Sequence, residues 1–135
     1  MCGFSKKWDL GSGDYVSASR ARGAFRELLQ RHCSPDSDLD GAEIIFGELL
    51  TNALRYSGGD ATVEVHCHGP QVFLDVRDCG HGFDLDTADE HRSGDAEGGR
   101  GLMIARRLST DLRVDAGHAG CVVQAGLPVT CTVSR

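Results

Sequence analysis

The chain has 135 residues, of which 40% are hydrophobic and 25% charged, and its formal net charge is −6. This length is enough for one domain with a single core, and the acidic balance disfavours nucleic acid as a direct partner. No apolar run approaches the roughly 18 residues that a membrane span needs, and the N-terminus lacks the apolar stretch of a secretory signal, so we expect a cytoplasmic protein.

The first half of the chain predicts two helices. The expected segments are residues 1–13, as an irregular lead-in or short strand, and helices over residues 15–32 and 38–57. Asp14 is a good N-cap for the first helix, and either Ser37 or Asp38 serves the second. The pair Gly58-Gly59 is a stop signal for the second helix.

Four arginines concentrate on the first predicted helix: Arg20, Arg22, Arg26 and Arg31. Such a local basic patch is an exception in a chain of net charge −6. It fits a solvated helix face, and it also fits a docking surface for an acidic protein partner. The sequence leaves both interpretations open.

The middle of the chain predicts a β-hairpin. Apolar and polar residues alternate over residues 61–68 and again over 71–78, and Gly69-Pro70 between them is a turn signal. Asp78 ends the second strand on the same side as the apolar residues that precede it. A carboxylate that points toward a core needs a hydrogen-bond donor.

The last third begins with a polar, glycine-containing loop and returns to regular structure. A loop of this length inside a small domain is usually functional or disordered. The expected elements are the loop over residues 84–99, a helix over 101–109, strands over 112–116 and 121–127, and a terminal edge strand over 129–133.

The second predicted helix carries a carboxylate and a carboxamide on one face. Glu48 and Asn52 are four residues apart, which is about one helical turn and roughly 6 Å of rise. The side-chain oxygen of Asn52 is a suitable neutral ligand for Mg²⁺. Glu48 is then placed to orient or deprotonate an attacking hydroxyl or water. Alone, the pair also fits two exposed polar residues.

Two glycine-rich clusters follow this helix. In the first, Asp78 precedes Gly80 and Gly82, which let the backbone approach a flat ring, while Asp78 accepts a hydrogen bond from an amino group on it. In the second, Gly99 and Gly101 open a helix, where free backbone N–H groups favour a phosphate. Each cluster alone is a weak signal, because it also fits an ordinary turn.

The three segments in this order resemble the ATPase superfamily of gyrase, heat-shock-90 chaperones, histidine kinases and MutL. The resemblance covers about residues 14–127 and implies one domain over residues 1–135. Its expected parts are an N box over 48–57, a G1 box over 78–83, an ATP lid over 84–99 and a G2 box over 98–104. The implied fold is an α/β (α+β) two-layer sandwich, with about three helices on one face of a mixed, largely antiparallel sheet.

The resemblance assigns roles to individual residues. It implies Asn52 as the Mg²⁺ ligand and Asp78 as the adenine contact. The remaining residues that it places at the ATP site are Arg55, Gly80, Gly82, Phe83, Gly99, Arg100, Gly101 and Leu102. Tyr56, where many relatives have histidine, and the arginine at position 100 depart from the family pattern.

Within the superfamily, a single domain of this length looks most like bacterial anti-sigma factors. That resemblance implies a serine/threonine protein kinase with Glu48 as general base. Its implied partners are a sigma factor, an anti-anti-sigma protein of the STAS type, or both, and it also implies a homodimer. Two alternatives stay open: an ATP-binding module that sequesters a partner without catalysis, and the separate catalytic domain of a histidine kinase.

Six cysteines are spread along the chain and form no CxxC pair, so we expect free thiols. His66, Cys67 and His68 are contiguous and suggest a metal site. In a strand, however, His66 and His68 share one face while Cys67 points to the other. We therefore expect structural or surface histidines.

Overall fold

The structure, a computed structural model, describes residues 4–11, 14–56, 60–78, 103–117 and 120–132. Its elements are β1 (Ser5–Leu10), α1 (Tyr15–His32), α2 (Leu39–Tyr56), β2 (Ala61–His68), β3 (Gln71–Asp78), β4 (Asp111–Gly117) and β5 (Gly120–Thr130). Between β3 and β4, residues 103–108 are helical. Of the helices in these ranges, none combines the length and the apolar character that crossing a bilayer requires.

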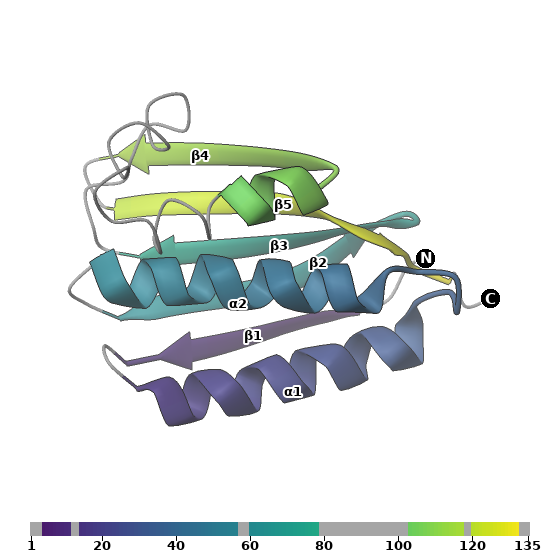
Figure 1. The fold of residues 1–135 in the computed structure, drawn as a ribbon, viewed down its shortest axis with the longest axis horizontal. Coiled ribbons are helices and arrows are strands. Elements are labelled where there is room, and N and C mark those ends of the chain that lie inside the picture. Colours follow the sequence, from purple (N-terminus) through teal and green to yellow (C-terminus); the bar gives the residue numbers. More distant parts are fainter. Residues whose placement is uncertain (1–3, 12–13, 57–59, 79–102, 118–119, 133–135) are drawn as a thin grey trace.

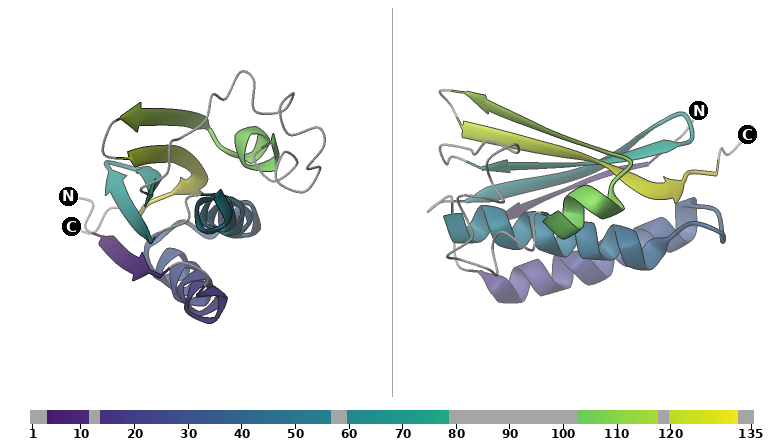
Figure 2. Two further views of the ribbon diagram at one scale, coloured as in Figure 1. Left: turned by 90° about the vertical axis from the view of Figure 1, so that its left-hand side faces the viewer. Right: turned by 45° about the horizontal axis from the view of Figure 1, so that its top comes forward.

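The strands form one sheet in the order β1-β2-β3-β5-β4, so β3 is central and β1 and β4 are its edges (Figure 1). Every pairing between described strands is antiparallel. Helices α1 and α2 and the short helix cover one face of the sheet, and none of these three covers the other face (Figure 2). The predicted two-layer α+β sandwich is confirmed.

The helix boundaries follow local signals in the sequence. The Asp14 carboxylate accepts a hydrogen bond from the Ser17 backbone N–H at 3.0 Å, and this bond lowers the pKa of Asp14. The Asp38 carboxylate accepts from the Gly41 N–H at 2.9 Å, so Asp38 is the cap of α2. In the hairpin, Gly69 adopts a φ of 61°, which glycine reaches without strain.

Aromatic side chains join the helices to the sheet. The rings of Phe25 on α1 and Phe46 on α2 stack with centroids 4.5 Å apart, and both side chains are fully buried. Trp8 on β1 meets both rings edge-on, at 6.5 Å and 5.8 Å. Below them, alternate residues of the strands complete the core, including Val63, Val65, Val72, Leu74 and Val76. This alternation explains why one sheet face is apolar and covered.

The C-terminal strand differs from the prediction. Val129 and Thr130 continue β5, and Cys131 forms an isolated bridge with Cys33, so the expected separate edge strand over 129–133 is wrong for the described residues. Backbone bonds tie this strand to the α1–α2 connection, from Ser34 N to Thr130 O at 2.8 Å and from Asp38 N to Pro128 O at 3.0 Å. We call these contacts the C-terminal clamp.

Two of the four α1 arginines are part of an ion-pair network with α2. Arg22 donates to Glu43 at 3.0 Å, and Arg26 donates to Asp40 at 2.8 Å and to Glu43 at 2.7 Å. The two carboxylates raise the pKa of Arg26. Arg22 and Arg26 therefore serve helix packing, which leaves only the other two arginines for the docking surface that the sequence suggested.

The expectation of free thiols is wrong at Cys67, which is disulfide-bonded. Cys33 is a buried free thiol. Burial, and secondarily the nearby Cys131, raises the pKa of the Cys33 thiol from 9.0 to about 11. The Cys33 thiol therefore stays protonated in the folded protein at a pH where the unfolded chain ionises it.

This pKa difference predicts a loss of stability in alkaline solution. The free energy of unfolding should stay constant on this account below pH 9 and fall as the pH rises toward 11, because the unfolded chain releases the Cys33 proton first. The slope is about 1 kcal/mol per pH unit. Urea titrations at several pH values should show a shallower slope for Cys33→Ala, and an unchanged slope would contradict the assignment.

Candidate nucleotide site

Helix α2 presents two neighbouring stripes with different environments. Ile45, Leu49 and Ala53 are buried against the sheet, as their spacing predicts. On the adjacent stripe, Ile44 is 37% exposed and Asn52 only 8% exposed. Glu48, between them, is half-buried. The stripe that carries Glu48 and Asn52 therefore becomes more buried toward the C-terminal end of α2.

The side-chain oxygen of Asn52 is buried and has no hydrogen-bond partner among the described residues. A buried acceptor without a partner costs about 1–3 kcal/mol, and a bound water or ion is one way in which such an atom is satisfied. A neutral amide oxygen is a ligand type that Mg²⁺ accepts. Asn52 thus fits the metal role that the sequence predicts, on an observation independent of the motif.

Glu48 lies one turn before Asn52 on the same stripe. Glu48 is half-buried, so part of this residue is accessible to solvent. Within the described residues, no salt bridge engages Glu48, in contrast to Glu43 five residues earlier. The general-base role of Glu48 stays a prediction, with which the lack of a salt bridge in the described part of the chain is compatible.

Asp78 ends β3, the central strand of the sheet, where it pairs with Ala61 of β2 and Cys121 of β5. It is half-buried, whereas Val72, Leu74 and Val76 before it are buried. Figure 1 shows that β3 and α2 have their C-terminal ends on the same side of the molecule. The fold thus brings the elements of Asp78 and Asn52 to one end.

The other predicted site residues lie outside the described residues. These are Gly80, Gly82 and Phe83 of the first glycine cluster, the loop over 84–99, and Gly99, Arg100, Gly101 and Leu102 of the second. Arg55 belongs to α2, but its side chain is not described. The roles assigned to all of them stay predictions.

A second polar cluster lies on the helix-free face of the sheet, and the sequence did not indicate it. Asp75 is only 8% exposed. It accepts from Gln124 at 2.9 Å, and its second oxygen lies 3.2 Å from Nε2 of His66, whose ring stacks on Phe73. Strand alternation predicts Asp75 outward, which is correct, but its burial comes from neighbours on two other strands. His66 therefore belongs to a side-chain network of the sheet, as expected for a structural histidine.

Comparison with known families identifies the class. Residues 12–126 match the family described as the histidine kinase-like ATPase domain, and the chain belongs to this family. Membership implies ATP binding, for which domains of this fold usually use Mg²⁺. Among curated proteins, none matches the sequence.

Solved structures support the fold. The catalytic domain of histidine kinase ThkA aligns with a TM-score of 0.55 at 14% identity, over 93% of this chain and 96% of that one. The mycobacterial sensor histidine kinase MprB gives 0.56 at 19%, over 96% and 100%. The histidine kinase domain of the blue-light activated kinase from Erythrobacter litoralis gives 0.52 at 22%, over 84% of this chain and 60% of that chain. At these identities the likeness concerns fold alone.

Proposed function

We propose that this protein is a cytoplasmic ATP-dependent serine/threonine protein kinase that acts as an anti-sigma factor. Its substrate is an anti-anti-sigma protein of the STAS type, and its second partner is a sigma factor that it binds as a homodimer. The observation that carries the catalytic part is the pair on α2, in which the buried Asn52 oxygen lacks a partner and Glu48 stands one turn away. The anti-sigma assignment rests on the resemblance of the sequence segments.

The chemistry follows from these positions. Asn52 would hold Mg²⁺ through its amide oxygen, and the bound metal neutralises charge on the phosphates. Asp78, at the end of β3, would accept a hydrogen bond from the adenine amino group. Glu48 would accept the proton of the attacking serine or threonine hydroxyl. Such a site supplies rate mainly by positioning and electrostatics.

Glu48→Gln separates binding from catalysis. We expect ATP affinity to change little, because the metal ligand and the adenine contact remain, while phosphotransfer falls about 100-fold or more, since the amide cannot accept the proton. Glu64→Gln is a matched control, because it is the same substitution at a glutamate on the helix-free face of the sheet. Radiolabelled ATP and a STAS-domain substrate provide the assay.

The outcome distinguishes the alternatives. Label on serine or threonine that disappears in Glu48→Gln supports the proposal. Label that persists in this variant contradicts the role of Glu48. ATP binding with no transfer identifies a regulatory module that sequesters its partner. Acid-labile phosphate on a partner histidine identifies a separate histidine kinase catalytic domain instead.

A further inference from the structure

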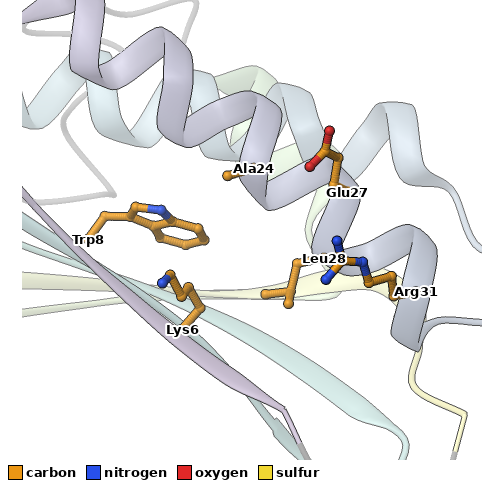
Figure 3. Close-up of a pocket in the computed structure, with 6 residues that line it drawn as sticks. All are labelled: Lys6, Trp8, Ala24, Glu27, Leu28 and Arg31. Carbon is orange, nitrogen blue, oxygen red and sulfur yellow. The ribbon is translucent and has the colours of Figure 1, made fainter.

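A groove opens between β1 and α1, away from the residues of the nucleotide site (Figure 3). Its volume is about 230 Å³, which is room for one large apolar side chain. It is lined by Lys6 and Trp8 of β1 and by Ala24, Glu27, Leu28 and Arg31 of α1. Figure 3 shows Lys6 and Trp8 on the strand side of the groove and Leu28 and Arg31 on the helix side, while the Glu27 carboxylate points away from β1.

The groove combines an apolar floor with a cationic rim. Trp8 and Leu28 are half-buried and form the floor. Lys6 and Arg31 carry two positive charges against the single carboxylate of Glu27. Among the described residues, no ion pair involves Lys6 or Arg31, whereas Arg22 and Arg26 on the same helix are neutralised by α2. The groove is thus locally positive in a chain of net charge −6.

Strand β1 adds a second binding element. It is an edge strand with β2 on one side only, so one row of its backbone N–H and C=O groups lacks a strand partner in the described sheet. Edge strands of this kind accept an extended peptide through main-chain hydrogen bonds, and adjacent pockets select its side chains.

We propose that the groove is a docking site for an extended acidic segment of a partner protein, which adds to β1 as a strand. One apolar side chain of the segment enters between Trp8 and Leu28, and a carboxylate near it meets Lys6 and Arg31. The site does not depend on the proposed kinase activity, because no residue that lines it belongs to the nucleotide site.

Charge complementarity favours such a segment over a second copy of this chain. A second β1 would bring Lys6 and Lys7 to an edge that already carries them, and like charges on adjacent strands are unfavourable. The one acid of β1, Asp9, already accepts a hydrogen bond from the Thr62 hydroxyl at 2.9 Å. An acidic strand avoids the repulsion between lysines and supplies carboxylates that are not yet hydrogen-bonded.

Trp8 allows a direct binding test, because it is the only tryptophan of the chain. The full chain is titrated with a short peptide that carries an aspartate two residues from a leucine, so that both side chains lie on one face of the added strand, and with the same peptide carrying lysine in place of aspartate. We expect a saturable change in tryptophan fluorescence with the acidic peptide only. Raising the salt concentration should weaken the binding.

Charge-neutralising variants locate the site. The double variant Lys6→Gln/Arg31→Gln should bind the acidic peptide more weakly, with an affinity reduced about ten-fold or more. Lys7→Gln is the matched control, because Lys7 lies on the opposite face of β1 in register with Glu64, and its affinity should equal that of the wild type.

Three results would overturn the proposal. The first is no saturable change up to millimolar acidic peptide with a folded sample, as judged by circular dichroism. The second is equal binding of the lysine peptide, or equal weakening by Lys7→Gln. The third is sedimentation of the wild type as a dimer that the double variant dissociates, since a second copy then occupies the groove.

Discussion

Replacing Asn52 with leucine is expected to abolish binding of Mg²⁺–ATP without destabilising the fold. Leucine has the same branching and number of side-chain heavy atoms, although it is larger, and it removes a buried oxygen that lacks a protein partner in the described structure. A buried unsatisfied acceptor costs about 1–3 kcal/mol, so the free energy of unfolding should stay equal or rise. Loss of the metal ligand should weaken nucleotide binding about 100-fold or more.

Calorimetry with and without Mg²⁺ measures the affinity, and urea unfolding measures the stability. Thr51→Val is a suitable control, because Thr51 is the neighbouring residue on α2 and is exposed. The combination of lost affinity and unchanged or greater stability is the signature of a residue kept for a ligand. If Asn52→Leu instead keeps its affinity for Mg²⁺–ATP and loses stability, the side chain is structural and the metal role is wrong.

Phe25→Ala should lower the free energy of unfolding more than any other substitution named above. The ring is fully buried, stacks on Phe46 at 4.5 Å and meets the edge of Trp8 at 6.5 Å, so its removal leaves a cavity where both helices meet the sheet. Substitutions of this kind cost about 3–5 kcal/mol. For a domain whose total stability is about 5–15 kcal/mol, this is a large fraction.

Chemical denaturation followed by circular dichroism measures this loss. Val16→Ala is the matched control on the same helix, because Val16 is 67% exposed, and its effect should stay within about 0.5 kcal/mol. A loss of less than about 1 kcal/mol for Phe25→Ala would show that the surrounding side chains collapse into the space, and that the aromatic cluster does not anchor the helices.

The sequence predicts the helices and the hairpin well because their signals are local. Asp14 and Asp38 stand directly before apolar patterns of helical period, and both cap the helices that they precede. Gly69-Pro70 separates two alternating segments, which pair as the predicted hairpin, with His68 opposite Gln71. In each case the deciding interaction spans only a few residues.

Features that depend on distant strands could not be predicted in the same way. The burial of Asp75 requires His66 from β2 and Gln124 from β5, and only the strand order brings these together. Likewise, the pairing of Arg26 with Glu43 depends on the packing of α1 against α2. A basic stretch in sequence does not reveal which of its members are neutralised.

The candidate site lies between these two cases. The spacing of Glu48 and Asn52 predicts that they share a helix face, and the structure places both on one stripe of α2. The burial of the Asn52 oxygen without a partner was not predictable, because it depends on how that end of α2 packs in the tertiary structure. A buried acceptor that lacks a hydrogen-bond partner is a stronger argument for a ligand than the spacing of two residues.

The C-terminal clamp has a consequence for how the protein is made. Ser34 and Asp38, which join the two long helices, receive their backbone partners from Thr130 and Pro128. During synthesis the two helices emerge from the ribosome well before these partners in β5, because translation runs from the N-terminus to the C-terminus. The nascent helices therefore keep apolar surface uncovered until β5 has been synthesised, and during that interval they present the largest surface to chaperones.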